Sequence, residues 1–293
     1  MSELLFGLIF AHFVADFLLQ TDDINSLKSK IRKRKGICAL LKHSFHHFLC
    51  YFIICSVHCL LFNANPIYIL LTPFLISITH FIIDCLKAFI CHRTSVFLNT
   101  ITYIIDQLLH IITIFLILQF VTKQIHYSTF EIINFFKYFL NKENVYILLS
   151  LKDKLFLLGT IIIITTHVSG YLIGMILKPF ELKHSFHHSK IETRYSNNTL
   201  EHITEITDTT KFYRDSASKV GQYIGMIERL IIVILVSFEA INSVGFLIAL
   251  KALTRFRQFE DKQFAEYYLV GSLLSILLGL VIGFFTMKIL TIA

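Results

Sequence analysis

The sequence has little charge, few backbone-breaking residues and no tryptophan, and these shortages exclude several classes of protein. Only 16% of its 293 residues are Asp, Glu, Lys or Arg, whereas an average soluble domain carries about 25%. So little charge cannot cover the surface of a soluble globule of this length. Three Pro and 11 Gly are too few for a collagen-like or low-complexity chain. The sequence also lacks a phosphate-binding loop, a nucleophile elbow and zinc-finger spacing.

What the sequence has instead is apolar residues, which make up 55% of the chain and give a mean hydropathy of +0.67. They gather in runs near the roughly 20 residues that a membrane-spanning helix needs. We therefore predict an all-α, polytopic membrane helix bundle with about 7–8 transmembrane helices. The predicted spans are 3–20, 37–62, 66–91, 99–122, 155–177, 222–240, the short 242–255, and 267–290. Pro179 should end the fifth span. A cleaved signal peptide is not expected, because His12 and Asp16 interrupt the first run.

Basic residues cluster in the connections 21–36, 178–221 and 255–262, which predicts that these face the cytoplasm. The expected location is the cell inner (cytoplasmic) membrane, as a multi-pass protein. We predict three parts: a four-helix membrane half (1–122), an outer amphipathic segment (123–154) and a second membrane half (155–293) with a polar cytoplasmic loop at 178–221. A basic run can also bind nucleic acid, but beside a span the topological interpretation is favoured, and no nucleic acid is expected. The six cysteines show no disulfide spacing and are interpreted as small apolar residues.

Ionisable side chains recur at helical spacing inside the first four predicted spans. Residues at i and i+4 share one face of a helix, and an ionisable group in hydrocarbon costs several kcal/mol unless it is paired. Each is therefore a candidate functional residue. In span order they are His12, Asp16 and Gln20; His43 and His47; His80, Asp84 and Lys87; Asp106 and His110. The alternating span directions place the four i, i+4 pairs, three His/Asp and one His/His, at one depth in the cytoplasmic half of the bilayer.

Four helices that each present such a pair at one depth indicate a metal site in a bundle core. Mixed imidazole and carboxylate donors favour a divalent metal, with Zn²⁺ first, and the number of donors allows one or two ions. Asp16, Asp84 and Asp106 are the candidate general bases or orienting partners. Gln20 and Lys87 are candidates for binding substrate, Lys87 through an anionic group such as phosphate. The alternative interpretation is a hydrogen-bond network that holds helices together.

A second polar cluster accompanies the last three predicted spans. A charged rim there would recognise a substrate headgroup or a soluble cytoplasmic partner. The alternative is that the charges extend to the interface or neutralise one another, as Glu228–Lys251 or Glu266–Arg255. The residues concerned are Glu228, Arg229, Lys251, Arg255 and Glu266.

The sequence of residues 41–47, LKHSFHH, recurs at 182–188. Because the flanking residues differ, coincidence in a biased composition is favoured over a duplicated site. His58 and His167 stand alone in apolar surroundings and are interpreted as packing or interfacial residues.

The motifs of the first four spans together resemble a bacterial membrane family, "domain of unknown function 3307". They are HxxxDFxxQ from His12, the His43–His47 pair, HFIIDxxK from His80 and DQxxH from Asp106. The resemblance covers about the first 115 residues. Later stretches around Glu228, Arg255 and Glu266 look like the C-terminal part of longer members. The His/Asp pattern is similar to that of membrane-bound metal-dependent hydrolases, which implies hydrolase chemistry by analogy.

The favoured interpretation is a metal-dependent hydrolase whose ligands are His12, Asp16, His43, His47, His80, Asp84, Asp106 and His110. Its substrate would be a lipid or small molecule, either amphipathic or a phosphoester, at the inner leaflet. One alternative is a proton or cation transporter or channel that uses the same residues. Another is a non-enzymatic anchor or effector that docks a soluble partner. Membrane lipid is an expected partner in each case, and a homo-oligomer is compatible with all three.

Overall fold

The computed structural model describes residues 2–28, 33–62, 66–90, 96–123, 134, 137–138, 149–180, 188–196, 199–207, 211–260 and 262–292. The N-terminal helices are α1 (Ser2–Phe17), α2 (Asp22–Lys28), α3 (Arg34–Phe62), α4 (Ile67–Ile90) and α5 (Val96–Thr122). Then come α7 (Leu151–Ile163), a π-helix η1 (Ile164–Val168), α8 (Ser169–Leu177) and a 3₁₀ turn η2 (Lys178–Phe180). After strands β1 (His188–Ser196) and β2 (Thr199–Thr207), the chain ends in α9 (Lys211–Ser237), α10 (Asn242–Thr254), η3 (Phe256–Glu260) and α11 (Lys262–Thr291).

Within the described residues, six helical segments are long and apolar enough to cross a membrane. They are Arg34–Leu61, Ile69–Phe89, Phe97–Thr122, Leu151–Phe180, Val220–Ser237 and Lys262–Thr291. The pair α1 and α2, bent by 89°, would be a seventh if it counts as one span. The predicted helical membrane bundle is therefore confirmed. The predicted span 242–255 corresponds to α10, which has only 13 residues and is short for a crossing.

The outward faces of the helices are apolar, as they are in proteins surrounded by lipid. Leu60 is 81% exposed, Phe120 74% and Leu253 75%. In water such a surface would drive aggregation, whereas in a bilayer it contacts the acyl chains, and the helices satisfy their own backbone hydrogen bonds. Composition, helix length and surface together describe a multi-pass membrane protein.

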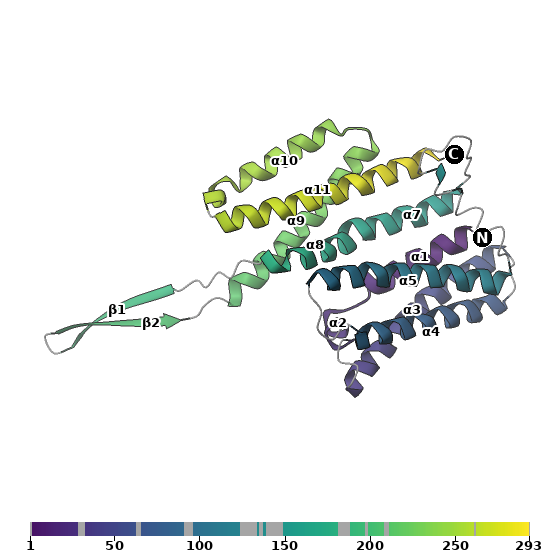
Figure 1. Ribbon diagram of the computed structural model, residues 1–293, viewed down its shortest axis with the longest axis horizontal. Coiled ribbons are helices and arrows are strands. Elements are labelled where there is room, and N and C mark those ends of the chain that lie inside the picture. Colours follow the sequence, from purple (N-terminus) through teal and green to yellow (C-terminus); the bar gives the residue numbers. More distant parts are fainter. Residues whose placement is uncertain are drawn as a thin grey trace.

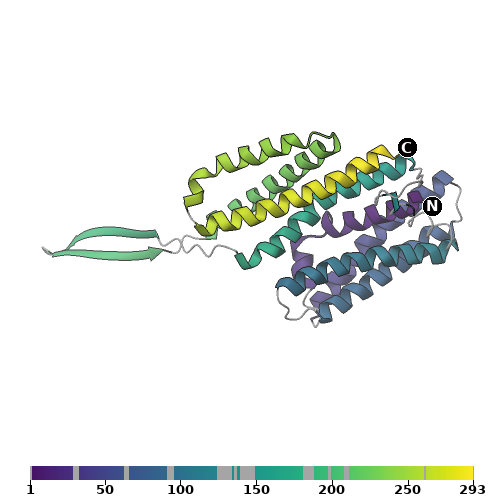
Figure 2. The same ribbon diagram turned by 45° about the horizontal axis from the view of Figure 1, so that its top comes forward.

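The helices fall into two groups with α7 and α8 between them (Figures 1 and 2). One group is α1, α3, α4 and α5, and the other is α9, α10 and α11. Helix α7 packs against α1, and the π-helix packs against α9. The long segment α7–α8 therefore connects the two groups and ends, as predicted, just before Pro179.

The polar segment 178–221 contains a β-hairpin that the sequence analysis did not predict. Strands β1 and β2 pair antiparallel, with His188 opposite Thr207 and Ser196 opposite Thr199, and both views show them extending away from the helices (Figures 1 and 2). Thr and Ile, which favour strands, recur along β2. The second copy of the LKHSFHH repeat, apart from the backbone of His188, and most of the predicted outer segment 123–154 lie outside the described residues.

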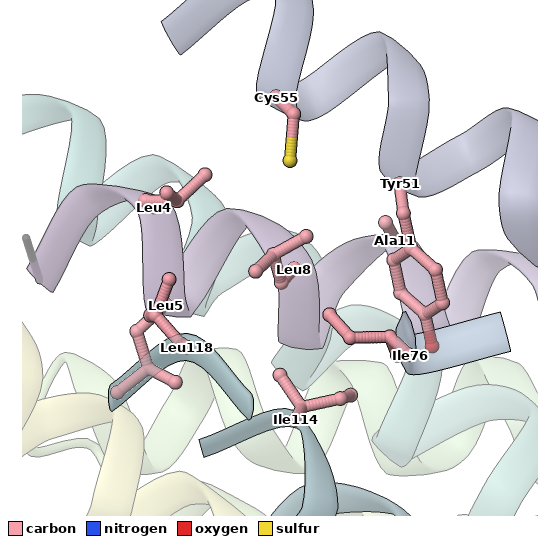
Figure 3. Packing of buried hydrophobic residues seen from close by; sticks show 9 residues of the cluster. All are labelled: Leu4, Leu5, Leu8, Ala11, Tyr51, Cys55, Ile76, Ile114 and Leu118. Atoms are coloured by element: carbon pink, nitrogen blue, oxygen red, sulfur yellow. The ribbon is translucent and has the colours of Figure 1, made fainter. Parts of the chain in front are cut away.

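An apolar core fills the N-terminal group at the end where α1 begins (Figure 3). Its side chains come from α1, α3, α4 and α5, and all are at most 9% exposed. They are Leu4, Leu5, Leu8, Ala11, Tyr51, Cys55, Ile76, Ile114 and Leu118. The core ends at Ala11, which precedes His12 on α1, and at Tyr51, which lies one turn beyond His47 on α3. This layer positions the site described next.

Candidate metal centre

Four helices bring the predicted ionisable residues together inside the N-terminal group. His12 and Asp16 lie near the C-terminal end of α1, and the pairs on α3, α4 and α5 reach the same level. Each side chain is at most 9% exposed. The eight predicted ligands are His12, Asp16, His43, His47, His80, Asp84, Asp106 and His110.

The first group of donors combines Asp16 with three histidines. Asp16 Oδ1 lies 3.0 Å from His43 Nε2 and 3.1 Å from His47 Nε2. His80 Nε2 lies 3.2 Å from His43 Nε2 and 3.9 Å from the same Asp16 oxygen. The four donor atoms lie within 4.8 Å of one another. Three imidazole nitrogens and one carboxylate oxygen are a donor set that suits a divalent transition metal.

The second group shares His80 with the first and adds Asp84 and His110. Asp84 Oδ2 lies 3.8 Å from His80 Nε2, while Asp84 Oδ1 lies 3.7 Å from His110 Nε2. The rings of His80 and His110 stack, with their centroids 4.0 Å apart. Asp106, one turn before His110 on α5, places Oδ1 3.5 Å from His110 Nε2.

His12 completes the cluster from α1. Its Nε2 lies 3.5 Å from Asp16 Oδ2. Its ring centroid lies 5.2 Å from that of His110 and 5.3 Å from that of His47. His12 therefore lies between the two groups.

The spacing of these donors suits ligands around an ion, and the shortest separations also suit direct hydrogen bonds. Donors bound to one Zn²⁺ at about 2.0–2.1 Å in a tetrahedron lie about 3.3 Å apart, and the N–O separations in the cluster run from 3.0 to 3.9 Å. Six buried side-chain atoms of the cluster have no hydrogen-bond partner: His12 Nε2, His43 Nδ1, His80 Nδ1, His110 Nδ1, His110 Nε2 and Asp106 Oδ1. A buried polar group without a partner costs about 1–3 kcal/mol. The cluster could therefore hold a metal ion.

Residues 4–139 match the model of a family described as "Protein of unknown function (DUF3307)". The N-terminal segment is therefore similar to the DUF3307 family. The match includes all four helices of the cluster and confirms the resemblance seen in the sequence motifs. It stops at residue 139, so it gives no support to the expected family likeness of the C-terminal stretches. No curated protein and no solved structure matches the chain.

Tyr51, a buried residue in the segment that matches the family model, was missing from the predicted site. Its hydroxyl lies 3.3 Å from His12 Nδ1 and 3.3 Å from His47 Nδ1. Because the hydroxyl oxygen can accept from both Nδ1–H groups, it holds both rings with Nε2 directed at the cluster. The signal was present in the sequence, since Tyr51 continues the i, i+4 ladder of His43 and His47.

Gln107, whose sequence neighbours are Asp106 and Leu108, was also missing from the predicted site. Its Nε2 donates a hydrogen bond of 3.0 Å to Asp16 Oδ2. This contact joins α5 to α1 and occupies the Asp16 oxygen that faces away from His43 and His47. Gln107 therefore orients the carboxylate of the first group.

Two lysines border the cluster at the end away from the apolar core. Lys87 Nζ lies 2.6 Å from Asp106 Oδ2, and its side chain is 36% exposed. Lys28 Nζ lies 3.3 Å from Asp84 Oδ2, and its side chain is 18% exposed. Lys28 reaches this place because α2 turns away from α1 at 89°. No sequence pattern indicates this contact, since Lys28 belongs to the basic run that is interpreted as a topology signal.

The expectation that Gln20 shares a helix face with His12 and Asp16 is wrong. Helix α1 ends at Phe17, so the i, i+4 spacing no longer determines where Gln20 points. Gln20 is half-buried in the turn that leads to α2.

The predicted C-terminal polar residues lie apart from the cluster, on the far side of α7 and α8 (Figure 1). The predicted ion pair between Glu228 and Lys251 is present, with Lys251 Nζ 2.6 Å from Glu228 Oε2. Both line a cavity of about 350 Å³ between α9, α10 and α11. Lys251 Nζ also lies 5.4 Å from the centre of the Tyr268 ring.

Arg229 is not on an exposed rim but is 3% exposed. Its Nε donates to the carbonyl of Thr165 at 2.7 Å, and its Nη2 donates to the carbonyl of Thr166 at 3.0 Å. The π-helix Ile164–Val168 presents these carbonyls, because its changed hydrogen-bond register frees main-chain acceptors. The sequence carried no signal for this contact, which depends on a local backbone distortion.

Arg255 and Glu266 lie near the junction of α10 and α11. The Arg255 guanidinium lies 6.0 Å from the centre of the Phe264 ring. Glu266 lies 3.9 Å from Lys262, one turn away on the exposed surface of α11. Neither residue contributes to the two donor groups of the cluster.

Proposed function

We propose that this protein is an integral membrane hydrolase that uses a divalent metal ion, Zn²⁺ first, held by the His/Asp cluster. The observation that supports it most strongly is the convergence of buried imidazole and carboxylate donors from four helices at ligand spacing. A metal bound there, with one open position, would supply hydroxide near neutral pH by lowering the pKa of bound water. Asp16, Asp84 and Asp106 are the candidates for the general base.

Access to the site favours an anionic substrate. Within the described part of the chain, Lys28 and Lys87 form ion pairs with carboxylates of the cluster, and both are partly exposed. Lys28 now pairs with Asp84, and Lys87 with Asp106. The phosphate group of an arriving phosphoester can replace these carboxylates as the partner of the two lysines, which leaves the carboxylates to bind the metal. The basic connection near Lys28 supports an entrance on the cytoplasmic side of the membrane. We therefore propose a phosphoester or similar amphipathic substrate that approaches from the inner leaflet of the cytoplasmic membrane.

The apolar core favours hydrolysis over ion transport. Leu4, Leu5, Leu8, Ile114 and Leu118 fill the bundle beyond the cluster and are at most 9% exposed (Figure 3). A proton or cation path would need polar groups or water through this layer. A site that is closed at one end and bordered by cations at the other is typical of an enzyme pocket.

The full chain, purified in detergent, tests the proposal by elemental analysis and by a hydrolysis assay. The probes are p-nitrophenyl phosphate, bis-p-nitrophenyl phosphate and vesicles that contain phosphatidic acid. We expect at least one tightly bound divalent ion per chain and metal-dependent release of product from at least one probe. His43→Ala should lower both metal content and hydrolysis by at least 100-fold.

His46→Ala is the matched control, because His46 lies on the same helix, is half-buried and belongs to neither donor group. It should retain metal and activity. A chain that binds no metal, even after incubation with Zn²⁺ or Mn²⁺, would overturn the proposal. Cation flux into proteoliposomes that His43→Ala abolishes, without hydrolysis, would point to the transporter instead.

A further inference from the structure

We propose that the cluster holds two divalent ions rather than one, and that the Asp84 carboxylate bridges them. This inference rests on the proposed function, since it concerns the same site. One ion accepts four to six donors from a protein and solvent, whereas the cluster presents eight side chains. Two separate sets among them meet the distance requirement for a shared ion, and His80 is common to both.

The two oxygens of Asp84 face different sets. Oδ2 lies 3.7 Å from His43 Nε2, a member of the first set. Oδ1 lies 3.7 Å from His110 Nε2, a member of the second. In two-metal hydrolytic sites the ions lie about 3.5–4 Å apart, a span that one carboxylate covers with its two oxygens. Asp84 is thus placed as a bridge rather than as a ligand of a single ion.

The first set would hold one ion through Asp16, His43 and His47. These residues already contact one another at 3.0–3.1 Å. Because these contacts are short enough for hydrogen bonds, the first set can also be explained as an internal network. The stronger indication of a second ion comes from His110 and Asp106.

Two buried atoms without partners lie close together at His110 of the second set and at Asp106, one turn before it on α5. His110 Nε2 and Asp106 Oδ1 are buried and have no hydrogen-bond partner, although they lie 3.5 Å apart. That separation fits two ligands of a common ion and is too long for a good hydrogen bond. His110 and Asp106, with Asp84 Oδ1, therefore form a second centre, and His80 lies between the two centres.

The decisive experiment is metal counting combined with electron paramagnetic resonance. The full chain in detergent is stripped with chelator, titrated with Mn²⁺ and analysed for bound metal. We expect two Mn²⁺ per chain. We also expect the spectrum of an exchange-coupled pair, because two Mn²⁺ ions that share a carboxylate couple magnetically.

Two variants test which residues hold the second ion and which residue bridges the two ions. His110→Ala should reduce the stoichiometry from two Mn²⁺ to one and convert the coupled spectrum to that of an isolated ion. Asp84→Asn should also abolish the coupling and weaken binding of the second ion at least 10-fold. His46→Ala should keep two coupled ions. If a variant does not fold, the wild-type stoichiometry and spectrum alone decide the question.

The possible results separate this inference from the proposed function. One Mn²⁺ per chain at saturation would overturn the two-ion inference and leave the metal-dependent hydrolase intact. Two ions without coupling would overturn the bridge. No bound metal would overturn both the inference and the function on which it rests.

Discussion

The N-terminal and C-terminal helices bury ionisable groups in opposite ways. In the C-terminal part, Arg229 is surrounded by acceptors, with two carbonyls from the π-helix and Ser275 Oγ at 3.4 Å. In the N-terminal part, His12, His110 and Asp106 are equally buried but keep atoms without hydrogen-bond partners. A buried group with all its partners is accounted for by the protein, whereas buried groups without partners call for an explanation such as a bound ion or water. The comparison supports a structural role for Arg229 and a binding role for the cluster.

Metal removal should cause the largest loss of stability, and only the N-terminal group of helices should be affected. An ion present at about 1,000 times its Kd stabilises the folded state by about 4 kcal/mol, and this is lost when a chelator removes the ion. We expect amide hydrogen exchange to accelerate in α1, α3, α4 and α5 and to stay constant in α9–α11. Equal acceleration in both regions would contradict the comparison.

Arg229→Met should destabilise the C-terminal region without affecting metal binding. The substitution leaves the carbonyls of Thr165 and Thr166 buried without a donor, at a cost of roughly 3 kcal/mol. Thermal unfolding in detergent measures the loss of stability, and elemental analysis should find the wild-type metal content. A metal content that falls with the substitution would show that Arg229 serves the cluster after all.

Tyr51→Phe should weaken metal binding while leaving the apolar core intact. Removing the hydroxyl frees the rings of His12 and His47 to rotate, and such orienting contacts are worth about 10–100-fold in metal affinity. Competition with a chromophoric chelator measures the affinity, and the unfolding temperature of the metal-free chain should change little. An unchanged affinity would show that packing alone orients the rings.

Replacing a glycine at the close contact between α9 and α11 should cause the smallest loss of stability. A Cβ at Gly283 on α11 would lie 2.7 Å from Val236 Cβ on α9. Overpacking costs about 1–3 kcal/mol, and the better helix propensity of Ala offsets part of that, which leaves about 1 kcal/mol of destabilisation for Gly283→Ala.

Gly174→Ala on α8 is the control for this substitution, because an added Cβ there has nothing within 4 Å. Thermal unfolding should find it neutral or slightly stabilising. If both variants behave alike, the contact between α9 and α11 does not require glycine.

Much of the fold and of the candidate site could be read from the pattern of residues. Long apolar runs must form helices in a membrane, because only internal hydrogen bonds satisfy their backbone, and the predicted spans agree closely with α3, α4, α5 and α11. The i, i+4 pairs likewise identified the residues of the cluster, since a helix fixes which side chains share a face.

The sequence by itself therefore determined the helices, their apolar surfaces and the eight His and Asp residues that gather inside the first group. It did not determine the contacts between segments that are distant along the chain. The 89° bend that brings Lys28 to Asp84, the π-helix that receives Arg229 and the division of the Asp84 oxygens between two donor sets are of this kind. Periodicity reports the face of one helix, whereas these features depend on how helices pack, and only the tertiary structure decides that.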